Sequence, residues 1–285
     1  MNYSNKYTVG IVGLGLMGAS MALALRGFRD ARLLGADKDG LVCRRAVAAG
    51  IVHEATDDVG YIVEQSDLIL FCVYARHIPG LVQAHAKRLK PGCVVSDICG
   101  VKGPLYEALL PLLPEGAAYV GVHPMAGKER DGYENAEPGL YRGCGFLITP
   151  TARSTDESVA LMRELAGYIG AARISVVSPA EHDEVIAYTS DLMHIAAAGL
   201  CVRPHPGFGP AFTAGAFRDC TRVADINAEA WTELLMDNRG NTAAALDRYI
   251  ADLRDIRAAL DAGDRQALGA ILRRAGENKR EMGHR

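Results

Sequence analysis

The 285-residue sequence lacks the features that mark several large classes of protein. It has no basic excess, since 31 Lys and Arg stand against 34 Asp and Glu, which argues against nucleic acid or an anionic membrane surface as a partner. No uninterrupted apolar run approaches the roughly 20 residues of a membrane-spanning helix. The polar stretch over residues 1–8 is unlike a signal peptide. We therefore expect a cytoplasmic protein with no membrane partner.

The cysteines form no arrangement that favours a disulfide or a metal site. None of the seven belongs to a Cys-x-x-Cys pair, and several lie inside apolar runs. Reduced, mostly buried thiols fit this pattern better than disulfides or zinc, and the histidines show no ligand spacing either. The sequence thus predicts no metal site. Its length suits one large domain or two ordinary ones.

A glycine-rich turn lies between the first predicted strand, residues 7–13, and an Ala- and Leu-rich helix that runs to residue 27. In this strand–turn–helix context, GLGLMG is typical of a turn that binds a dinucleotide pyrophosphate at the amino end of the helix. A glycine turn in an unrelated α/β protein is the alternative. The residues expected to contact the cofactor are Gly13, Leu14, Gly15, Leu16, Met17 and Gly18.

An acidic residue follows the second predicted strand, residues 31–36. Asp37 comes 19 residues after Gly18, where a carboxylate can accept hydrogen bonds from both ribose hydroxyls of the cofactor. The same charge would repel the 2′-phosphate of NADP. Asp37 therefore favours NAD, although the neighbouring Lys38 weakens that preference.

Further predicted strands alternate with helical stretches along the first 177 residues. They span residues 67–73, 93–99, 117–122, 145–149 and 173–177. This alternation predicts a Rossmann-type, doubly wound α/β domain with a mostly parallel sheet over residues 1–177. Residues 178–285 are predicted to form an all-α domain, which opens with a capping box at Ser178 and Glu181.

Polar residues interrupt the apolar helix predicted over residues 179–202. Ser190 and His194 lie four apart on one face, Asp191 is at the edge of that face, and His182 is in the first turn. Buried polar groups need hydrogen bonds, which either a core network or a ligand would supply.

Two other stretches carry candidate binding groups. His123 follows an apolar strand at its carboxyl end, where open α/β sheets place their ligands. A loop histidine with no task is the alternative. Arg218 and Arg222 flank Asp219, and guanidinium groups there suit a carboxylate, although surface ion pairing explains them as well.

Apolar residues recur at helical spacing from residue 229 to residue 260. The spacing predicts roughly 30 residues of helix with a bend at Gly240. A helix of that length is too long to flank a small domain. We therefore expect it to pack against a second copy of the chain, giving a homodimer.

Five segments, taken in order, resemble the prephenate dehydrogenase family of tyrosine biosynthesis and its arogenate-using relatives. They are GLGLMG with Asp37, DICGVK (97–102), HPMAGKE (123–129), HDEVIAYTSDLMH (182–194) and GAFRDCTR (215–222). HPMAG and FRDxTR are the most specific of these. The resemblance implies an NAD-dependent oxidative decarboxylation of prephenate to 4-hydroxyphenylpyruvate, or of arogenate to tyrosine.

The same resemblance implies roles for single residues. His123 corresponds to the catalytic histidine, which takes the proton of the substrate hydroxyl as hydride departs. Arg222 corresponds to an arginine that clamps a substrate carboxylate, and Glu129 to an acidic residue near that arginine. The remaining candidates are Ser190, His194, His182 and Arg218 for the substrate, and Val73 and Gly100 for the cofactor.

Two positions depart from the family pattern. Gly100 stands where many members have a serine that helps orient the catalytic histidine or the substrate hydroxyl. Loss of one hydrogen bond to a reacting group costs about 1–3 kcal/mol. Asp191 replaces a histidine of the helix motif, and Met193 replaces a proline. A carboxylate at Asp191 could bind an amino group, which would favour arogenate.

Two other functions fit parts of the sequence. Oxidation of a β-hydroxyacid would share the amino-terminal signals, but such enzymes rely on a helix lysine, and no lysine occurs between Lys128 and Lys279. A non-catalytic NAD-binding regulator would explain Gly100 and Asp191 as signs of lost activity. The retained histidine and arginine of the family motifs argue against that alternative.

Overall fold

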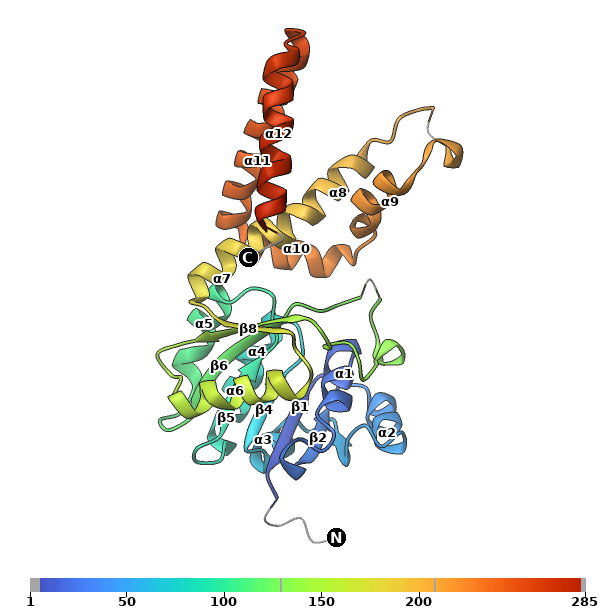
Figure 1. The fold of residues 1–285 in the computed structure, drawn as a ribbon. Coiled ribbons are helices and arrows are strands. Elements are labelled where there is room, and N and C mark those ends of the chain that lie inside the picture. Colours follow the sequence, from blue (N-terminus) through green and yellow to red (C-terminus); the bar gives the residue numbers. More distant parts are fainter. Residues whose placement is uncertain (1–5, 129, 208, 283–285) are drawn as a thin grey trace.

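The computed structural model describes residues 6–128, 130–207 and 209–282, and an eight-stranded sheet organises the first half of the chain (Figure 1). The strands are β1 (Thr8–Val12), β2 (Arg32–Ala36), β3 (Glu54–Thr56), β4 (Leu68–Phe71), β5 (Val94–Asp97), β6 (Ala118–Pro124), β7 (Gly145–Pro150) and β8 (Arg173–Val176). Their spatial order is β3-β2-β1-β4-β5-β6-β7-β8. β1 to β6 are parallel, β7 is antiparallel to β6, and β8 is parallel to β7.

This arrangement confirms the predicted Rossmann-type, mostly parallel sheet. β3, a short half-buried strand beside β2, is not among the predicted strands. The order of the strands reverses between β1 and β4, because the chain first builds outward to β3 and then returns to build outward to β8. Open α/β sheets bind ligands at such a reversal, beyond the carboxyl ends of the strands.

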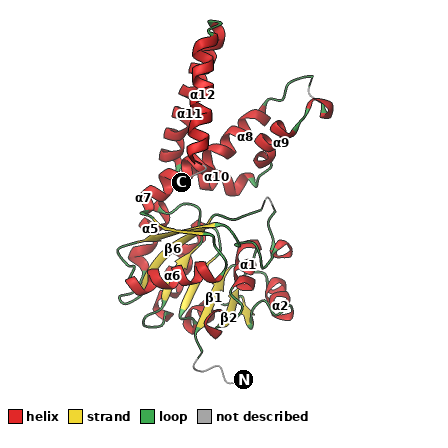
Figure 2. Ribbon diagram, viewed as in Figure 1, coloured by secondary structure: helices red, strands yellow, loops and turns green. Residues whose placement is uncertain are grey.

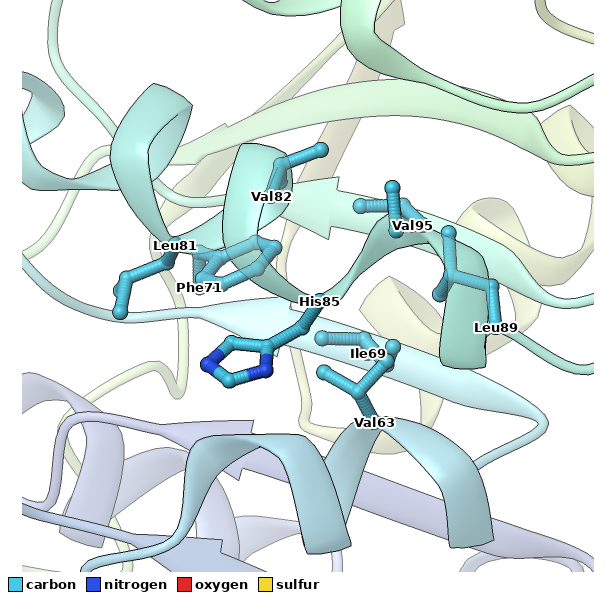
Figure 3. Close-up of a pocket in the computed structure, with 9 residues that line it drawn as sticks. Val63, Ile69, Phe71, Leu81, Val82, His85, Leu89 and Val95 are labelled. Atoms are coloured by element: carbon cyan, nitrogen blue, oxygen red, sulfur yellow. The ribbon is translucent and has the colours of Figure 1, made fainter.

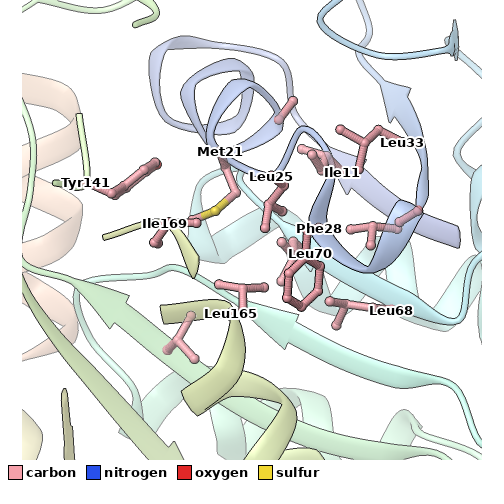
Figure 4. Close-up of a cluster of buried hydrophobic side chains, with 14 of the residues drawn as sticks. Ile11, Met21, Leu25, Phe28, Leu33, Leu68, Leu70, Tyr141, Leu165 and Ile169 are labelled. Atoms are coloured by element: carbon pink, nitrogen blue, oxygen red, sulfur yellow. The ribbon is translucent and has the colours of Figure 1, made fainter. Parts of the chain in front are cut away.

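Helices cover both faces of the sheet (Figure 2). They are α1 (Leu16–Ala24), α2 (Gly40–Ala48), α3 (Val59–Gln65), α4 (Ile78–His85), α5 (Gly103–Leu109) and α6 (Asp156–Tyr168). Successive strand residues point to opposite faces. Leu68 and Leu70 of β4 therefore pack with α1 and α6, in the core cluster of Figure 4. Ile69 and Phe71 pack with α3, α4 and α5.

The second half of the described chain is helical. It contains α7 (Pro179–Ile186), a π-helical turn (Ala187–Asp191), α8 (Leu192–Val202), α9 (Gly215–Thr221), α10 (Ala228–Asp237), α11 (Arg239–Asp261) and α12 (Arg265–Met282). The first three form one continuous helix. Figure 1 shows α11 and α12 side by side, projecting away from the sheet, with α8 and α9 diverging from them.

Local capping signals start two of these helices. The Ser178 hydroxyl accepts a hydrogen bond from the N–H of Glu181, which is one of the two bonds of the predicted capping box, and Pro179 occupies the first turn of α7. For α6 the capping residue is Thr155, whose hydroxyl accepts from the N–H of Ser158.

The prediction of a single long helix over residues 229–260 is wrong in one respect. The chain breaks it into α10 and α11 at Asn238, two residues before the expected bend at Gly240. The Asn238 side chain is buried and donates hydrogen bonds to the carbonyl of Asp183 and to the carboxylate of Asp191. These tertiary partners fix the position of the break.

By length and composition alone, the helix Pro179–Val202 would suffice to cross a membrane, with a mean hydropathy of 1.5. This is weak evidence, because the core helix of a protein assembly passes the same test. The helix also carries three buried polar side chains, His182, Asp183 and Asp191, which all have partners inside the protein.

Candidate active site

A cavity of about 780 Å³ opens at the carboxyl ends of β1, β2 and β4, where the strand order reverses. Its volume suits a dinucleotide. Its walls include six of the predicted cofactor residues, Gly13, Gly15, Leu16, Met17, Asp37 and Val73. A second cavity, under α4, measures only about 10 Å³ and is lined almost wholly by apolar side chains (Figure 3). It has room for about one water molecule and is part of the core.

The glycines of the turn have distinct tasks. Gly13 has a φ of 94°, in the left-handed region that favours glycine. A Cβ on Gly18 would lie 1.8 Å from the carbonyl oxygen of Gly13, so this close approach of helix and strand requires glycine. Gly15 caps α1 and faces open space. The amino end of α1 is thereby left accessible to a pyrophosphate, and the residues present fit a dinucleotide.

Asp37 lies at the cavity wall, and its carboxylate is held in place by the backbone. One oxygen accepts a hydrogen bond from the N–H of Leu14 at 2.8 Å, and the other from the N–H of Asp39 at 3.0 Å. Leu14 is absent from the cavity walls, since its side chain is fully buried and its N–H is engaged, so its contact with the cofactor stays a prediction. Gly18 packs on Gly13 and is likewise absent from the cavity walls.

His123 lies at the carboxyl end of β6 and is half-buried. Burial, and then the positive charge of Lys102 and the neighbouring His182, hold the pKa of His123 well below its ordinary value of 6.5. The imidazole is therefore neutral at pH 7 and has a lone pair available for a proton. Its Nδ1 lies 2.9 Å from Nε2 of His182.

His182 supports His123 from behind. It is 1% exposed, and its Nδ1 lies 2.7 Å from a carboxylate oxygen of Asp183. The first turn of α7 places the ring of His182 between His123 and Asp183, so its predicted contact with the substrate stays a prediction that this burial does not favour. The carboxylate of Asp183 also accepts from the N–H groups of Lys102 and Gly103, at 2.9 and 2.8 Å, at the amino end of α5.

A buried ion pair lies beneath the same strand end. Lys102 and Asp97 are both fully buried, with Nζ of Lys102 2.7 Å from the carboxylate and 2.8 Å from the carbonyl oxygen of Val122. Tyr119 donates to the other oxygen of Asp97. Lys102 thus fixes the backbone immediately before His123. Such a pair depends on both partners, since either charge alone would be costly to bury.

Gly100 lies beside His123 rather than in the walls of the cofactor cavity, so its predicted cofactor contact is not seen there. A Cβ built on Gly100 would lie 3.8 Å from Cε1 of His123 and 3.6 Å from a methyl group of Leu234 on α10. Both are ordinary contacts. The position therefore has space for a side chain between the histidine and the helical half.

His194 stacks on Trp231 of α10, with ring centroids 3.6 Å apart and an interplanar angle of 30°. Its Nδ1–H donates to the carbonyl of Ser190 at 3.0 Å. Ser190 lies in the π-helical turn, a feature often found at functional sites. Trp231 was expected only as an apolar residue of a long helix.

Asp191 does not face a substrate. It is fully buried, and one of its carboxylate oxygens accepts from Asn238 and from Thr242 on α11, each at 2.9 Å. Burial raises its pKa above the ordinary value. This environment contradicts the idea that Asp191 binds a substrate amino group.

The arginines lie apart from the cofactor cavity. Arg218 and Arg222 are exposed at the carboxyl end of α9, and neither contributes to the cavity walls. The turn that begins at Arg222 packs against α8, the helix that carries His194. Glu129 lies outside the described residues. Among those that are described, no group of His, Cys, Asp and Glu is arranged to hold a metal ion.

Three contacts link α10 and its capping residue to the walls of the cofactor cavity. Arg76, in the cavity wall, pairs with Glu233 and with the more exposed Glu229, 3.6 Å away. Asn227 donates to the carboxylate of Asp131, another wall residue, at 3.2 Å. α10 therefore lies over the region that contains Gly100 and His123.

Sequence reasoning missed four residues of this site: Asp97, Lys102, Asp183 and Trp231. Three of them lie inside segments that carry the family resemblance, which was the only available signal. Their partners are distant in the sequence; Lys102 and Asp183, for example, are 81 residues apart.

Comparisons with known proteins agree with this geometry. The model of the prephenate dehydrogenase nucleotide-binding domain matches residues 21–175, and that of the dimerization domain matches residues 178–274. The chain is 32% identical to cyclohexadienyl dehydrogenase of Zymomonas mobilis, over 90% of this chain and 89% of that one. It is 26% identical to prephenate dehydrogenase of Bacillus subtilis, over 92% and 72% of the two chains.

Solved structures give the same result. Prephenate dehydrogenase from A. aeolicus, in complex with hydroxyphenyl propionate and NAD+, is similar with a TM-score of 0.87 and 26% identity, over 99% of this chain and 100% of that one. Synechocystis arogenate dehydrogenase is similar with a TM-score of 0.84 and 26% identity, over 96% and 99%. In fold, in sequence and in the residues around His123, the chain belongs to the prephenate dehydrogenase family.

Proposed function

We propose that the protein is an NAD-dependent oxidoreductase that converts prephenate to 4-hydroxyphenylpyruvate with loss of carbon dioxide, in the cytoplasm, as a step of tyrosine biosynthesis. The observation that carries the proposal is His123. It is a neutral histidine at the carboxyl end of β6, braced by buried polar groups and close to a dinucleotide-sized cavity. A base in that position suits the removal of a hydroxyl proton.

In the proposed reaction His123 accepts the proton of the ring hydroxyl as the carbon that bears it is oxidised. Bound NAD supplies the hydride acceptor. The ring carboxylate then leaves as carbon dioxide, and the electrons of the broken carbon–carbon bond complete the aromatic ring. His123 returns its proton to the ring oxygen, so the phenol forms with no net release of protons.

Other residues would hold the substrate. Arg222 is proposed to clamp a carboxylate in a bidentate fork, with Arg218, His194 and Ser190 nearby. The packing of the Arg222 turn against α8 supports this, because α8 carries His194. The burial of Asp191 removes the one residue that favoured arogenate, and we therefore propose prephenate as the substrate.

Turnover of purified protein with NAD tests the proposal. NADH absorbance is followed with prephenate or arogenate, using wild type, His123→Asn and the matched control His205→Asn, which changes an exposed loop histidine. We expect reduction with prephenate, a loss of about 10²–10⁴-fold in kcat for His123→Asn, and no loss for the control. Measurable NAD binding without turnover of either substrate would instead favour the non-catalytic regulator.

A further inference from the structure

The buried groups behind His123 form a directed chain, from the carboxylate of Asp183 through the ring of His182 to Nδ1 of His123. We propose that His182 and Asp183 are positioning residues that fix which nitrogen of His123 carries its proton, so that Nε2 meets the substrate as a free base. This inference rests on the proposed role of His123.

The direction of the chain begins at Asp183. Three N–H groups converge on its carboxylate, from the backbone of Lys102 and Gly103 and from the ring of His182. Backbone N–H groups only donate, so the carboxylate is the acceptor for all of them. The backbone contacts also fix its orientation, because they belong to the amino end of α5. Nδ1 of His182 must therefore carry a hydrogen.

The remaining assignments follow from imidazole chemistry. A neutral ring has one N–H and one acceptor nitrogen. With its hydrogen on Nδ1, His182 presents Nε2 as an acceptor, 2.9 Å from Nδ1 of His123. His123 must then donate from Nδ1, and its Nε2 carries the lone pair. That tautomer is the one a general base requires if Nε2 is the nitrogen that faces the substrate.

The chain also matters after proton transfer. Fully buried Lys102 places a positive charge near His123 and opposes its protonation. When Nε2 of His123 takes the substrate proton, the imidazolium donates more strongly through His182 toward the carboxylate of Asp183. A hydrogen bond from a charged donor is stronger than that from a neutral one. The positioning residues therefore act on the transition state and have little effect on substrate binding.

Two substitutions of similar size separate positioning from simple packing. His182→Leu fills the space but cannot accept a hydrogen bond. His182→Gln restores the direction of the chain, since its amide donates to Asp183 and its carbonyl accepts from His123. We expect His182→Leu to lower kcat by about 10- to 100-fold with little change in the KM for prephenate. His182→Gln should recover most of that loss. NAD affinity and thermal unfolding serve as controls for folding.

A second measurement needs no turnover. In protein labelled with ¹⁵N-histidine, long-range ¹H–¹⁵N spectra report which ring nitrogen is protonated. We expect both His123 and His182 to carry hydrogen on Nδ1 in the wild type, and His123 to populate the Nε2–H form in His182→Leu.

The outcomes separate the two proposals. Wild-type His123 protonated on Nε2, unchanged kcat in His182→Leu, or equal losses in a folded Leu and Gln pair would each overturn the positioning role. A wild type with the expected tautomers but no prephenate turnover would leave the chain of hydrogen bonds standing and defeat the proposed function instead.

Discussion

The environment of His123 depends on the free space beside its ring as well as on the charged groups near it. Gly100 leaves room beside the ring, because a Cβ there would make only ordinary contacts with His123 and Leu234. Many family members have a serine at this position. The chain therefore lacks that hydroxyl beside His123 but has kept the space that would contain it.

We expect Gly100→Ser to raise kcat with prephenate by about 5- to 10-fold, since one hydrogen bond to a reacting group contributes about 1 kcal/mol or more. Gly100→Ala is the matched control, because it fills the same space without a hydroxyl and should leave kcat unchanged. Steady-state kinetics of the three proteins make the comparison. Equal rates for Ser and Ala would show that the hydroxyl has no partner here.

The sequence predicts the place of His123 but not its surroundings. An apolar strand that ends in HPMAG is enough to put a histidine at a sheet edge. The periodicity of an α-helix shows that His182 and His194 lie on nearby faces, yet it cannot tell which neighbour each face meets. His182 proved to face His123, and His194 to face Trp231. Contacts between residues dozens of positions apart depend on tertiary packing, which a single sequence does not display.

At the scale of whole elements, α10 is the part that joins the two halves over the site. Two contacts hold it there. Arg76 pairs with Glu233, and Asn227 donates a hydrogen bond to Asp131. Arg76 pairs with both Glu233 and Glu229. The Glu233 side chain is 20% exposed, whereas the Glu229 side chain is 85% exposed. Screening by salt therefore acts on both pairs, but more strongly on the second.

We expect Glu233→Gln to raise the KM for prephenate severalfold, because α10 is then held less firmly over His123. The increase should be largest at low salt and shrink as salt weakens the wild-type pair. Glu229→Gln, one turn earlier on the same helix, should have little effect. Titration of KM against sodium chloride distinguishes the cases. If the two variants behave alike, the contact between Arg76 and Glu233 has no special part in holding α10.

Element boundaries were predictable where the cause is local. Strands followed from apolar runs, and α7 from a serine and a proline at its start. The break at Asn238 was not predictable, because apolar spacing continues through it and its cause is a pair of buried hydrogen bonds to another helix. β3 was also missed, since its three half-buried residues give no apolar signal.

At the scale of the whole molecule, the helical half leaves large apolar side chains uncovered. Five of them, Leu200, Val202, Phe212, Leu260 and Leu272, are 55 to 82% exposed. They lie on the projecting helices and the turns between them, away from the sheet (Figure 1). Together with the match to a dimerization domain, this supports the homodimer expected from the sequence, in which a second copy would cover these surfaces.

We expect light scattering after gel filtration to give twice the 30.4 kDa mass of the chain. Leu260→Arg should shift the protein toward monomer and lower its thermal midpoint, because a charge would be buried in the interface. Leu41→Arg is the control, since Leu41 is an exposed leucine on α2, at 47%. A monomeric wild type at micromolar concentration would contradict the homodimer.

The position of Asp183 has a consequence for how such a protein can change over evolutionary time. The carboxylate belongs to the helical half, but two of its partners are backbone groups at the start of α5, in the sheet domain. A recombination event near residue 177 that imported a foreign helical half would have to preserve this one junction to a fraction of an ångström. We therefore expect the proposed base His123 and its supporting groups to be inherited together, although they lie on opposite sides of residue 177.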